Sequence, residues 1–271
     1  MFVYGIQGTL YLTHFIKNVK IKGDDFNMKF MGSKSRIKKE IVPIIQDYIT
    51  EDTTAYIEPF VGGCNVIDAI SHNIKIGSDN NKYLIDLHKE AKQGINFPTY
   101  RSKEHYSEVR EAYKNNTDKF PNWYIGLVGF LASYNGRFFD GGYAKTITTS
   151  KGTIRNYYDE AKRNYIEQIP YITDIEFRYC DYSYYTTDNT KGAVIYCDIP
   201  YANVKQYATS RNFDYPKFWN WVRTMSTCNI IIVSELQAPN DFKCIYEQPT
   251  TRTVDNTKRV NSVEKLFILN S

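Results

Sequence analysis

Two short segments carry residue types and spacings that could bind a ligand and act on it. The first reads Glu58-Pro-Phe-Val-Gly-Gly-Cys-Asn65. Its glycine pair, Gly62 and Gly63, would let backbone N–H groups approach a ligand closely, and Asp79, which follows Gly62 by 79 − 62 = 17 positions, could bind ribose hydroxyls. The same residues would also suit a plain tight turn between a strand and a helix, and they lack the G-x-G-x-x-G spacing of a dinucleotide-binding enzyme.

The second segment, Tyr196-Cys-Asp-Ile-Pro-Tyr201, could hold a planar amine. The Asp198 carboxylate could accept one amino hydrogen, and the Ile199 carbonyl, kept extended by Pro200, could accept the other. The ring of Tyr201 could stack on the ring that carries the amine. In isolation, this four-residue pattern is also a common turn.

Both segments need a parallel sheet to bring them together. Short β-prone or apolar runs predict strands at residues 54–60, 74–78, 193–196 and 230–233. Helices are predicted at residues 35–48, 64–72 and 215–225, the last from apolar residues at helical spacing. Because open α/β sheets bind ligands at the carboxyl ends of their strands, the two segments would share one edge of an α/β sheet.

The composition limits the classes of protein that this chain can be. With 271 residues, 42% hydrophobic and 24% charged, it is neither disordered nor collagen nor an extended coiled coil. The length allows one α/β domain with an insertion or two small domains. No apolar run reaches the roughly 18 residues that a membrane span requires. The net charge of +4 is compatible with a polyanionic partner but does not require one.

The cysteines and histidines argue against disulfides and metal. The five cysteines are an odd number without a C-x-x-C pair, and the four histidines show no ligand spacing. The sequence therefore favours a reducing, cytoplasmic setting without bound metal. Residues 1–27 lack the basic start and cleavage site of a secretory signal, so they are interpreted as an N-terminal extension whose order is open, with Met28 an equally good start.

In their order and setting, these motifs resemble the Dam-like DNA adenine N6-methyltransferases, many of which belong to bacteriophages and mobile elements. The resemblance covers about residues 29–269. Its Gly-x-Lys motif is matched by Phe30-Met-Gly-Ser-Lys34, its Glu-Pro-Phe-x-Gly by residues 58–62, its second-strand Asp by Asp79 and its Asp-Pro-Pro-Tyr by residues 198–201. Residues 133–142, 177–181, 233–235 and 258–267 agree further. Two departures are Ile199 in place of Pro and Cys64 in place of a loop glycine, which predicts crowding near the methionine end of the cofactor.

The resemblance implies a Rossmann-like class I methyltransferase sheet with helices on both faces, plus an inserted, mostly helical target-recognition subdomain. The catalytic domain would comprise residues 28–94 and 169–271, and the DNA-binding insertion residues 95–168. The cofactor would be S-adenosyl-L-methionine, and the reaction a methyl transfer to N6 of adenine without metal. Asp, rather than the Ser usual in cytosine N4 enzymes, at position 198 favours adenine.

The family's site residues carry over to this chain position by position. The catalytic motif would be Asp198, Ile199, Pro200 and Tyr201. The cofactor would be bound by Phe30, Lys34, Glu58, Pro59, Phe60, Gly62, Gly63, Asp79, Asp181 and Asp198. Within this set, Phe30 would pack, Lys34 would contact the cofactor and the catalytic motif, Asp79 would bind the ribose, and Asp181 would accept the amino group of the cofactor's adenine.

Double-stranded DNA would be the partner, because an enzyme that methylates a paired base must first flip it out. Residues 95–168 contain 11 Lys or Arg against 8 Asp or Glu and are rich in aromatic residues, although an ordinary solvated helical subdomain would look similar. DNA contacts are predicted for Lys29, Tyr134, Asn135 and Arg137, with Lys145 and Arg155 as secondary candidates. The Asn-Gly turn within residues 134–139 could place Arg137 on a base edge or a phosphate, and an aromatic ring in the space that the flipped base leaves in the duplex. Alternatively, Phe138 and Phe139 could belong to the hydrophobic core.

Alternative functions remain open at this level. Ile199 would also fit a relative that binds DNA but has lost turnover, and a Rossmann sheet would fit a nicotinamide-dependent oxidoreductase. For the methyltransferase, a cognate restriction endonuclease is a candidate partner, and the expected location is the cytoplasm of a bacterium or a phage-infected host.

Overall fold

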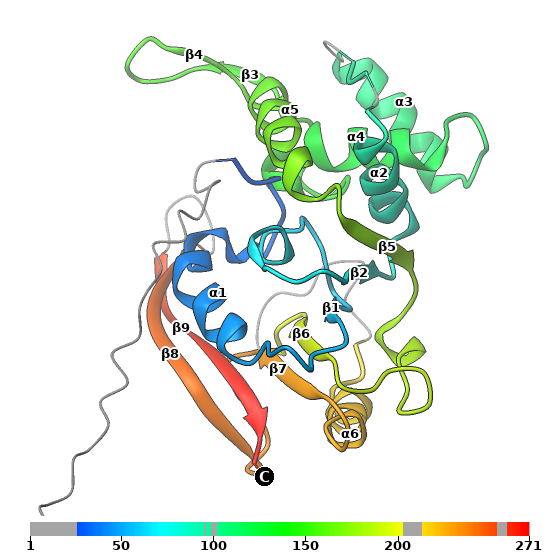
Figure 1. Cartoon of the computed structure of the whole chain (residues 1–271). Helices are drawn as coiled ribbons and strands as arrows, with labels where there is room; N and C mark the ends of the chain where they lie inside the picture. Colours follow the sequence, from blue (N-terminus) through cyan, green and yellow to red (C-terminus); the bar gives the residue numbers. More distant parts are fainter. Residues whose placement is uncertain (1–25, 95, 99–101, 203–212, 254–258, 271) are drawn as a thin grey trace, which may run out of the picture.

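The computed structural model describes residues 26–94, 96–98, 102–202, 213–253 and 259–270, so most of the predicted N-terminal extension lies outside the described residues. The main sheet has seven strands in the order β5-β2-β1-β6-β7-β9-β8 (Figure 1). These strands are β1 (Tyr56–Glu58), β2 (Lys75–Asp79), β5 (Ile175–Tyr179), β6 (Val194–Asp198), β7 (Ile230–Ser234), β8 (Phe242–Thr253) and β9 (Arg259–Leu269). The first five are parallel, and β9 runs antiparallel to β7 and β8. The predicted α/β architecture is therefore confirmed as a mixed fold with a mainly parallel sheet.

The strands β6 and β7 are largely apolar because both faces of the sheet are covered. In β6, Val194 and Tyr196 join one buried cluster, whereas Ile195 and Cys197 join another. The first cluster contains side chains of α1, α2, α4 and α5, and the second contains those of α6. The helices are α1 (Lys38–Asp47), α2 (Lys82–Lys92), α3 (Lys103–Lys114), α4 (Asn122–Leu131), α5 (Tyr157–Gln168) and α6 (Tyr215–Met225). Alternating side chains thus bury both faces, as expected for parallel strands.

The strand order places both sequence motifs at one point of the sheet. Strand β1 pairs with β2 on one side and with β6 on the other. The chain adds β2 and β5 outward on the first side and β6 and β7 outward on the second, so the order of strand addition reverses between β1 and β6. Residues 59–64 follow β1, and Asp198 is the last residue of β6. In open α/β sheets the crevice at such a reversal is where ligands bind.

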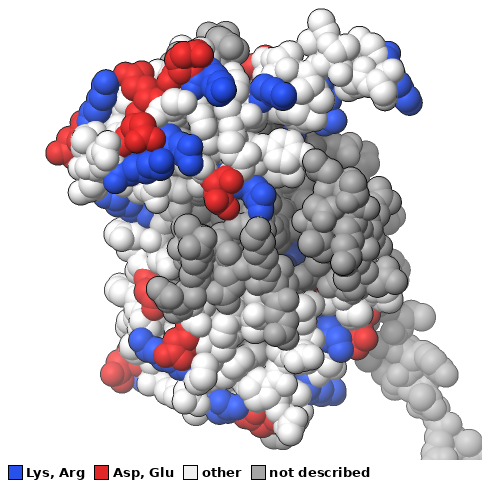
Figure 2. All heavy atoms as spheres, turned by 180° about the vertical axis from the view of Figure 1, so that it is seen from behind, with Lys and Arg blue, Asp and Glu red and all other residues white. Residues whose placement is uncertain are grey.

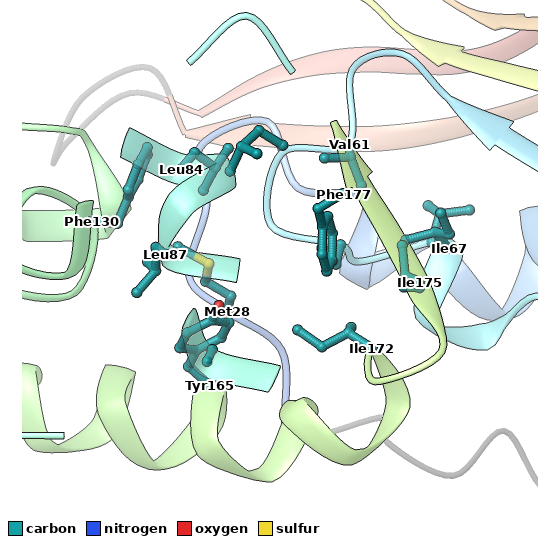
Figure 3. Packing of buried hydrophobic residues seen from close by; sticks show 14 of the residues in the cluster. Met28, Val61, Ile67, Leu84, Leu87, Phe130, Tyr165, Ile172, Ile175 and Phe177 are labelled. Atoms are coloured by element: carbon teal, nitrogen blue, oxygen red, sulfur yellow. The ribbon is translucent and has the colours of Figure 1, made fainter. Parts of the chain in front are cut away.

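Residues 103–168 form α3, α4, a two-stranded hairpin of β3 (Thr146–Thr148) and β4 (Ile154–Asn156), and α5. The hairpin projects away from the main sheet at the start of α5 (Figure 1). These helices share one hydrophobic cluster with the sheet, as Figure 3 shows for Phe130, Tyr165, Met28 and Ile175. The proposed limits of a separate recognition domain at residues 95–168 stay a prediction.

One predicted helix is wrong. Residues 64–72 contain only a short 3₁₀ turn, η2 (Ile67–Ala69). Cys64 has the left-handed φ of 60°, which a regular helix cannot contain, and the Gly63 and Cys64 carbonyls face the side-chain amide of Gln168. The Cys64 carbonyl accepts hydrogen bonds from both this amide and the N–H of Asp68, the latter at 3.4 Å, and the backbone then continues only as the 3₁₀ turn. The helix predicted at 215–225 is confirmed, and that at 35–48 is found as a 3₁₀ turn, η1 (Lys34–Arg36), followed by α1.

Several global features bear on function. All five cysteines are free thiols. Among the described residues, no helix is long and apolar enough to cross a membrane, and no group of three or more His, Cys, Asp or Glu is arranged to hold a metal ion. Figure 2 shows Lys and Arg interspersed with Asp and Glu on the rear face rather than gathered in one field.

Candidate active site

The glycine turn, residues 62–64, lies against the carboxylate at the end of β2. The N–H of Gly62 donates to Asp79 Oδ2 at 3.3 Å, and the N–H of Asn81 donates to Oδ1 at 2.9 Å. Burial raises the pKa of Asp79 to about 6, although these backbone hydrogen bonds lower it in part. A carboxylate that is so poorly solvated gains from any further hydrogen-bond donor.

The turn is closely covered by the segment that precedes Lys34. A Cβ added to Gly62 would lie 2.8 Å from Phe30 Cε1, and one added to Gly63 would lie 2.8 Å from Phe30 Cβ. The ring of Phe30 stacks on Phe130 at 5.5 Å. The Cys64 thiol lies in the core, 3.5 Å from His88 Nε2. The Cys64 side chain thus points into the core, and crowding against the methionine end of the cofactor stays a prediction.

Lys34 connects the Gly-x-Lys motif with the catalytic motif. The Ser33 side chain caps η1 and accepts a hydrogen bond from Asn65 Nδ2 at 2.7 Å, which places Lys34 over the crevice. The buried Nζ lies 2.7 Å from Asp198 Oδ1, 3.7 Å from Glu264 Oε2 and 4.6 Å from the centre of the Tyr201 ring. Burial lowers the pKa of Lys34, but these three groups outweigh it and raise the pKa above its usual value. Lys34 is thus a fixed positive charge.

Tyr201 is held by two strands on the far side of the crevice. Its hydroxyl donates to Glu264 Oε2 at 2.5 Å and lies 2.9 Å from Ser234 Oγ, which must then be the donor to it. Burial raises the pKa of Tyr201, so the phenol stays protonated. The Ile199 side chain is 3% exposed and packs in the core shared with α6, which explains how Ile replaces Pro in the motif.

The crevice contains further carboxyl groups. Glu58 is buried, accepts a hydrogen bond from the Tyr56 hydroxyl at 2.7 Å, and has a pKa raised by burial and by the charges of Asp68 and Asp198. Glu235, directly after β7, accepts from the N–H groups of Ala202 at 3.1 Å and Leu236 at 2.6 Å, and burial raises its pKa to about 7. The described part of the crevice thus gathers several carboxyl groups near the Lys34 ammonium, and the buried Lys38, paired with Asp68 at 2.6 Å, opposes the rise in the pKa of Glu58.

The remaining predicted cofactor residues line the same edge of the sheet. Asp181 follows β5, is exposed, and accepts hydrogen bonds from the N–H and hydroxyl of Ser183. The N–H of Cys180, next to it, donates to the Asp79 carbonyl at 3.2 Å, so the two acidic residues end neighbouring strands. Pro59 is buried, and the half-buried Phe60 stacks on Tyr182 at 5.7 Å.

The predicted Asn-Gly turn is present, with positive φ of 55° at Asn135 and 66° at Gly136. A Cβ on Gly136 would lie 2.0 Å from the Lys29 carbonyl, so this loop docks directly on the Gly-x-Lys segment. Phe139 is 5% exposed and Phe138 packs in the same cluster, so both rings belong to the core and not to a DNA gap. Tyr134 is the exposed ring of the loop.

Tyr134 belongs to an aromatic-basic patch, which we define as Lys29, Tyr134, Arg155 and Tyr157. The ring of Tyr157 meets Tyr134 edge-on at 6.0 Å and is flanked by Lys29 Nζ at 5.4 Å and the Arg155 guanidinium at 5.1 Å. Both cations also pair with Glu160, Lys29 at 3.2 Å and Arg155 at 2.6 Å. Arg137 lies half-buried behind Gly141 and outside this patch.

A comparison with protein-family models identifies the class of protein that this fold and site define. The model of the D12 class N6 adenine-specific DNA methyltransferases matches residues 30–247, most of the chain. The chain belongs to this family, and is therefore placed among the enzymes that methylate adenine in DNA. A search of curated proteins found no match. Family membership excludes the nicotinamide-dependent oxidoreductase considered from the sequence.

Four residues near the crevice were missed by sequence reasoning: Glu235, Glu264, His88 and Gln168. Glu235 and Glu264 lie within segments 233–235 and 258–267, which matched the family, but nothing local suggested their partners. His88 and Gln168 lie on the buried faces of α2 and α5. A polar residue among the apolar residues of a helix face is the sequence signal that could have marked each of them as a buried hydrogen-bonding group.

Proposed function

We propose that this protein transfers a methyl group from S-adenosyl-L-methionine to N6 of adenine at specific sites in duplex DNA, after flipping the base out. The observation that carries the proposal is the meeting of Asp198, Tyr201 and Lys34 at the strand edge that also carries the glycine turn. Family membership supports the substrate atom and the nucleic acid.

The residues around the glycine turn fit the cofactor. Gly62 and Gly63 leave no room for a Cβ beside Phe30, so the turn can stay a bare backbone that a ligand approaches closely, and Asp79 offers a half-buried carboxylate as a hydrogen-bond acceptor. Asp181 would accept the amino group of the cofactor's adenine. When bound, the cofactor supplies a methyl group activated by a sulfonium charge.

The catalytic residues would act on the amino group of the target. Its nitrogen is a poor nucleophile because its lone pair is delocalised into the ring. Asp198 and the Ile199 carbonyl would accept hydrogen bonds from its two N–H groups, and the negative charge of Asp198 would stabilise the positive charge that develops on nitrogen. The N–C bond would form as the S–C bond of the cofactor breaks, with S-adenosyl-L-homocysteine as the leaving group, and the methylated nitrogen would then release one proton to solvent. Tyr201, fixed by Glu264 and Ser234, would hold the ring in line.

In the absence of a flipped base, Lys34 would occupy the position between Asp198 and Tyr201 where the adenine is proposed to bind. Its ammonium contacts both the Asp198 carboxylate and the Tyr201 ring, the two groups proposed to receive the adenine. An entering amine would take over Asp198, and Lys34 would shift toward Glu264, which is already 3.7 Å away. Because the amine takes the place of the ammonium, the Asp198 carboxylate would keep a hydrogen-bond donor throughout the exchange.

A single experiment tests the proposed function and separates it from the alternative of an impaired DNA-binding relative. The protein is incubated with methyl-labelled cofactor and mixed-sequence unmethylated duplex DNA, and digested nucleosides are identified by mass spectrometry. We expect label in N6-methyladenine. DNA binding without incorporation would support the impaired relative, and label in N4-methylcytosine would overturn the choice of base.

The pKa of Asp79 predicts how cofactor binding depends on pH. The ribose hydroxyls would donate to the ionised carboxylate, so affinity for S-adenosyl-L-homocysteine should rise as pH rises. The pKa of about 6 places this change mainly below pH 6, where the dissociation constant should fall about tenfold per pH unit. Titration calorimetry from about pH 5 to pH 7 measures it. Asp79→Asn should bind more weakly and show a flat profile; an unchanged slope in this variant would assign the titration to another group.

The aromatic-basic patch predicts a contribution to DNA affinity. Replacing Arg155→Ala should weaken binding and reduce the slope of log K against log salt by about 1, as the loss of one phosphate contact does. Arg223→Ala is a matched control, because Arg223 also pairs with a carboxylate, Asp241, and lies over a ring, Phe242. If both substitutions change the salt slope equally, the prediction that Arg155 contacts DNA is wrong.

The predicted contacts of Lys29, Tyr134, Asn135 and Arg137 with DNA, the bacteriophage or mobile-element origin, the cytoplasmic location and the partner endonuclease stay predictions. For the last of these, co-purification from the native host is the direct measurement.

A further inference from the structure

Two buried side chains, Gln168 and His88, form hydrogen bonds to the carbonyl groups of the glycine turn. Gln168, the last residue of α5, is fully buried. Its Nε2 lies 2.9 Å from Asp68 Oδ2, 3.1 Å from the Gly63 carbonyl and 3.3 Å from the Cys64 carbonyl, and its Oε1 accepts from the N–H of Met28 at 3.0 Å. Because the amide has two N–H bonds, the two shortest contacts are the principal ones.

His88, on α2, binds the preceding carbonyl of the same turn, that of Gly62. Its Nε2 lies 2.8 Å from the Gly62 carbonyl, and its Nδ1 lies 2.7 Å from the Tyr165 hydroxyl. A carbonyl accepts only, so Nε2 carries the hydrogen and Nδ1 accepts from Tyr165. Burial lowers the pKa of His88 to about 4, so the ring keeps this neutral form at neutral pH.

These bonds decide which way the peptide groups of the turn face. In a trans peptide, the C=O of one residue and the N–H of the next point in opposite directions. With the Gly62 carbonyl turned toward His88, the Gly63 N–H points away from the core. The conformation needs support, since Cys64 is left-handed with φ of 60°, which is unfavourable for a residue other than glycine.

We infer that Gln168 and His88 are positioning residues, which orient the glycine turn for the cofactor and through Met28 keep the Gly-x-Lys segment docked on it. The inference rests on the proposed function. Tyr165 and Gln168 are three residues apart on one face of α5, the helix whose first half carries Glu160 and so anchors Lys29 and Arg155. One helix therefore supports both the turn and the aromatic-basic patch.

The first test replaces Gln168→Met, which keeps the length of the side chain and removes its hydrogen bonds. Gln46→Met is the matched control, because the Gln46 amide also bridges a backbone, donating to Ser71 O at 3.1 Å and accepting from Ser71 N at 2.9 Å. Calorimetry with S-adenosyl-L-homocysteine should show affinity reduced about tenfold or more by Gln168→Met and unchanged by Gln46→Met. In steady-state assays the KM for cofactor should rise with kcat nearly unchanged, since Asp198 stands on β6.

The second test uses His88 and stays informative if Gln168→Met does not fold. His88→Phe keeps a ring without a donor, whereas His88→Gln keeps an N–H near the Gly62 carbonyl. We expect His88→Phe to reduce affinity about tenfold and His88→Gln to restore most of it. Folded variants that bind like the wild type, or equal losses in Phe and Gln, would overturn the inference. Failure of the wild-type protein to bind the cofactor product would instead count against the proposed function.

Discussion

The substitution Asp198→Asn is expected to lower kcat for methyl transfer by about three orders of magnitude. Asn preserves the size of the side chain but carries no negative charge to stabilise the charge that develops on the target nitrogen. Its own N–H₂ group would also face Lys34, which lies 2.7 Å from the native carboxylate. Affinity for S-adenosyl-L-homocysteine should fall far less than the rate, because most of the predicted cofactor residues, Asp79 and the glycine turn among them, lie on other elements.

Single-turnover rates with labelled cofactor, together with calorimetric binding, measure the two quantities separately. Asp241→Asn is a control, because Asp241 is a half-exposed carboxylate paired with Arg223 at 2.6 Å and distant from the crevice. A rate for Asp198→Asn above about one tenth of the wild-type rate would refute the assignment of the charge, since the loss of a single catalytic electrostatic contact typically costs more than this.

The substitution Lys34→Met is expected to have the second large effect, on both stability and the pH dependence of catalysis. Lys34 is 5% exposed and faces two carboxylates. Removing one partner of such a pair leaves uncompensated charge, which typically costs about 3 kcal/mol. Because its folded pKa is raised above the unfolded value, this stabilisation is fully present at neutral pH and is lost only as pH rises through the folded pKa.

Catalysis should respond in a specific direction. Without the ammonium group, the carboxyl groups of Asp198, Glu264 and Glu58 repel one another, which favours protonation, so the acidic limb of the pH–rate profile should move to higher pH. Lys75→Met is a control: Lys75 is equally buried, but its partner Asp174 is 59% exposed and lies at the other end of β2. Lys75→Met should lower the free energy of unfolding by less than Lys34→Met and should leave the pH–rate profile unchanged. A profile unchanged in Lys34→Met would show that Lys34 does not set the charge of the site.

Much of the framework could be predicted from local sequence. Short β-prone runs identified β1 and β2, continuous apolar runs identified β6 and β7, and helical spacing of apolar residues identified α6 with its observed limits. The order of the glycine turn and the Asp-Ile-Pro-Tyr segment indicated the family. These features depend on neighbours along the chain, through burial of alternate or helically spaced side chains, so the sequence displays them directly.

The tertiary structure alone decided what holds the site. Gln168 reaches Gly63 across 105 positions, and Tyr201 reaches Glu264 across 63, so no local pattern could pair them. The helix predicted at residues 64–72 is reduced to a short 3₁₀ turn, because the chain enters it through Cys64 in the left-handed conformation. Burial likewise assigned Phe138 and Phe139 to the core and left Tyr134 exposed. The sequence determined which chemical groups are present and on which strand ends they stand; packing of distant segments determined their charges, partners and orientation.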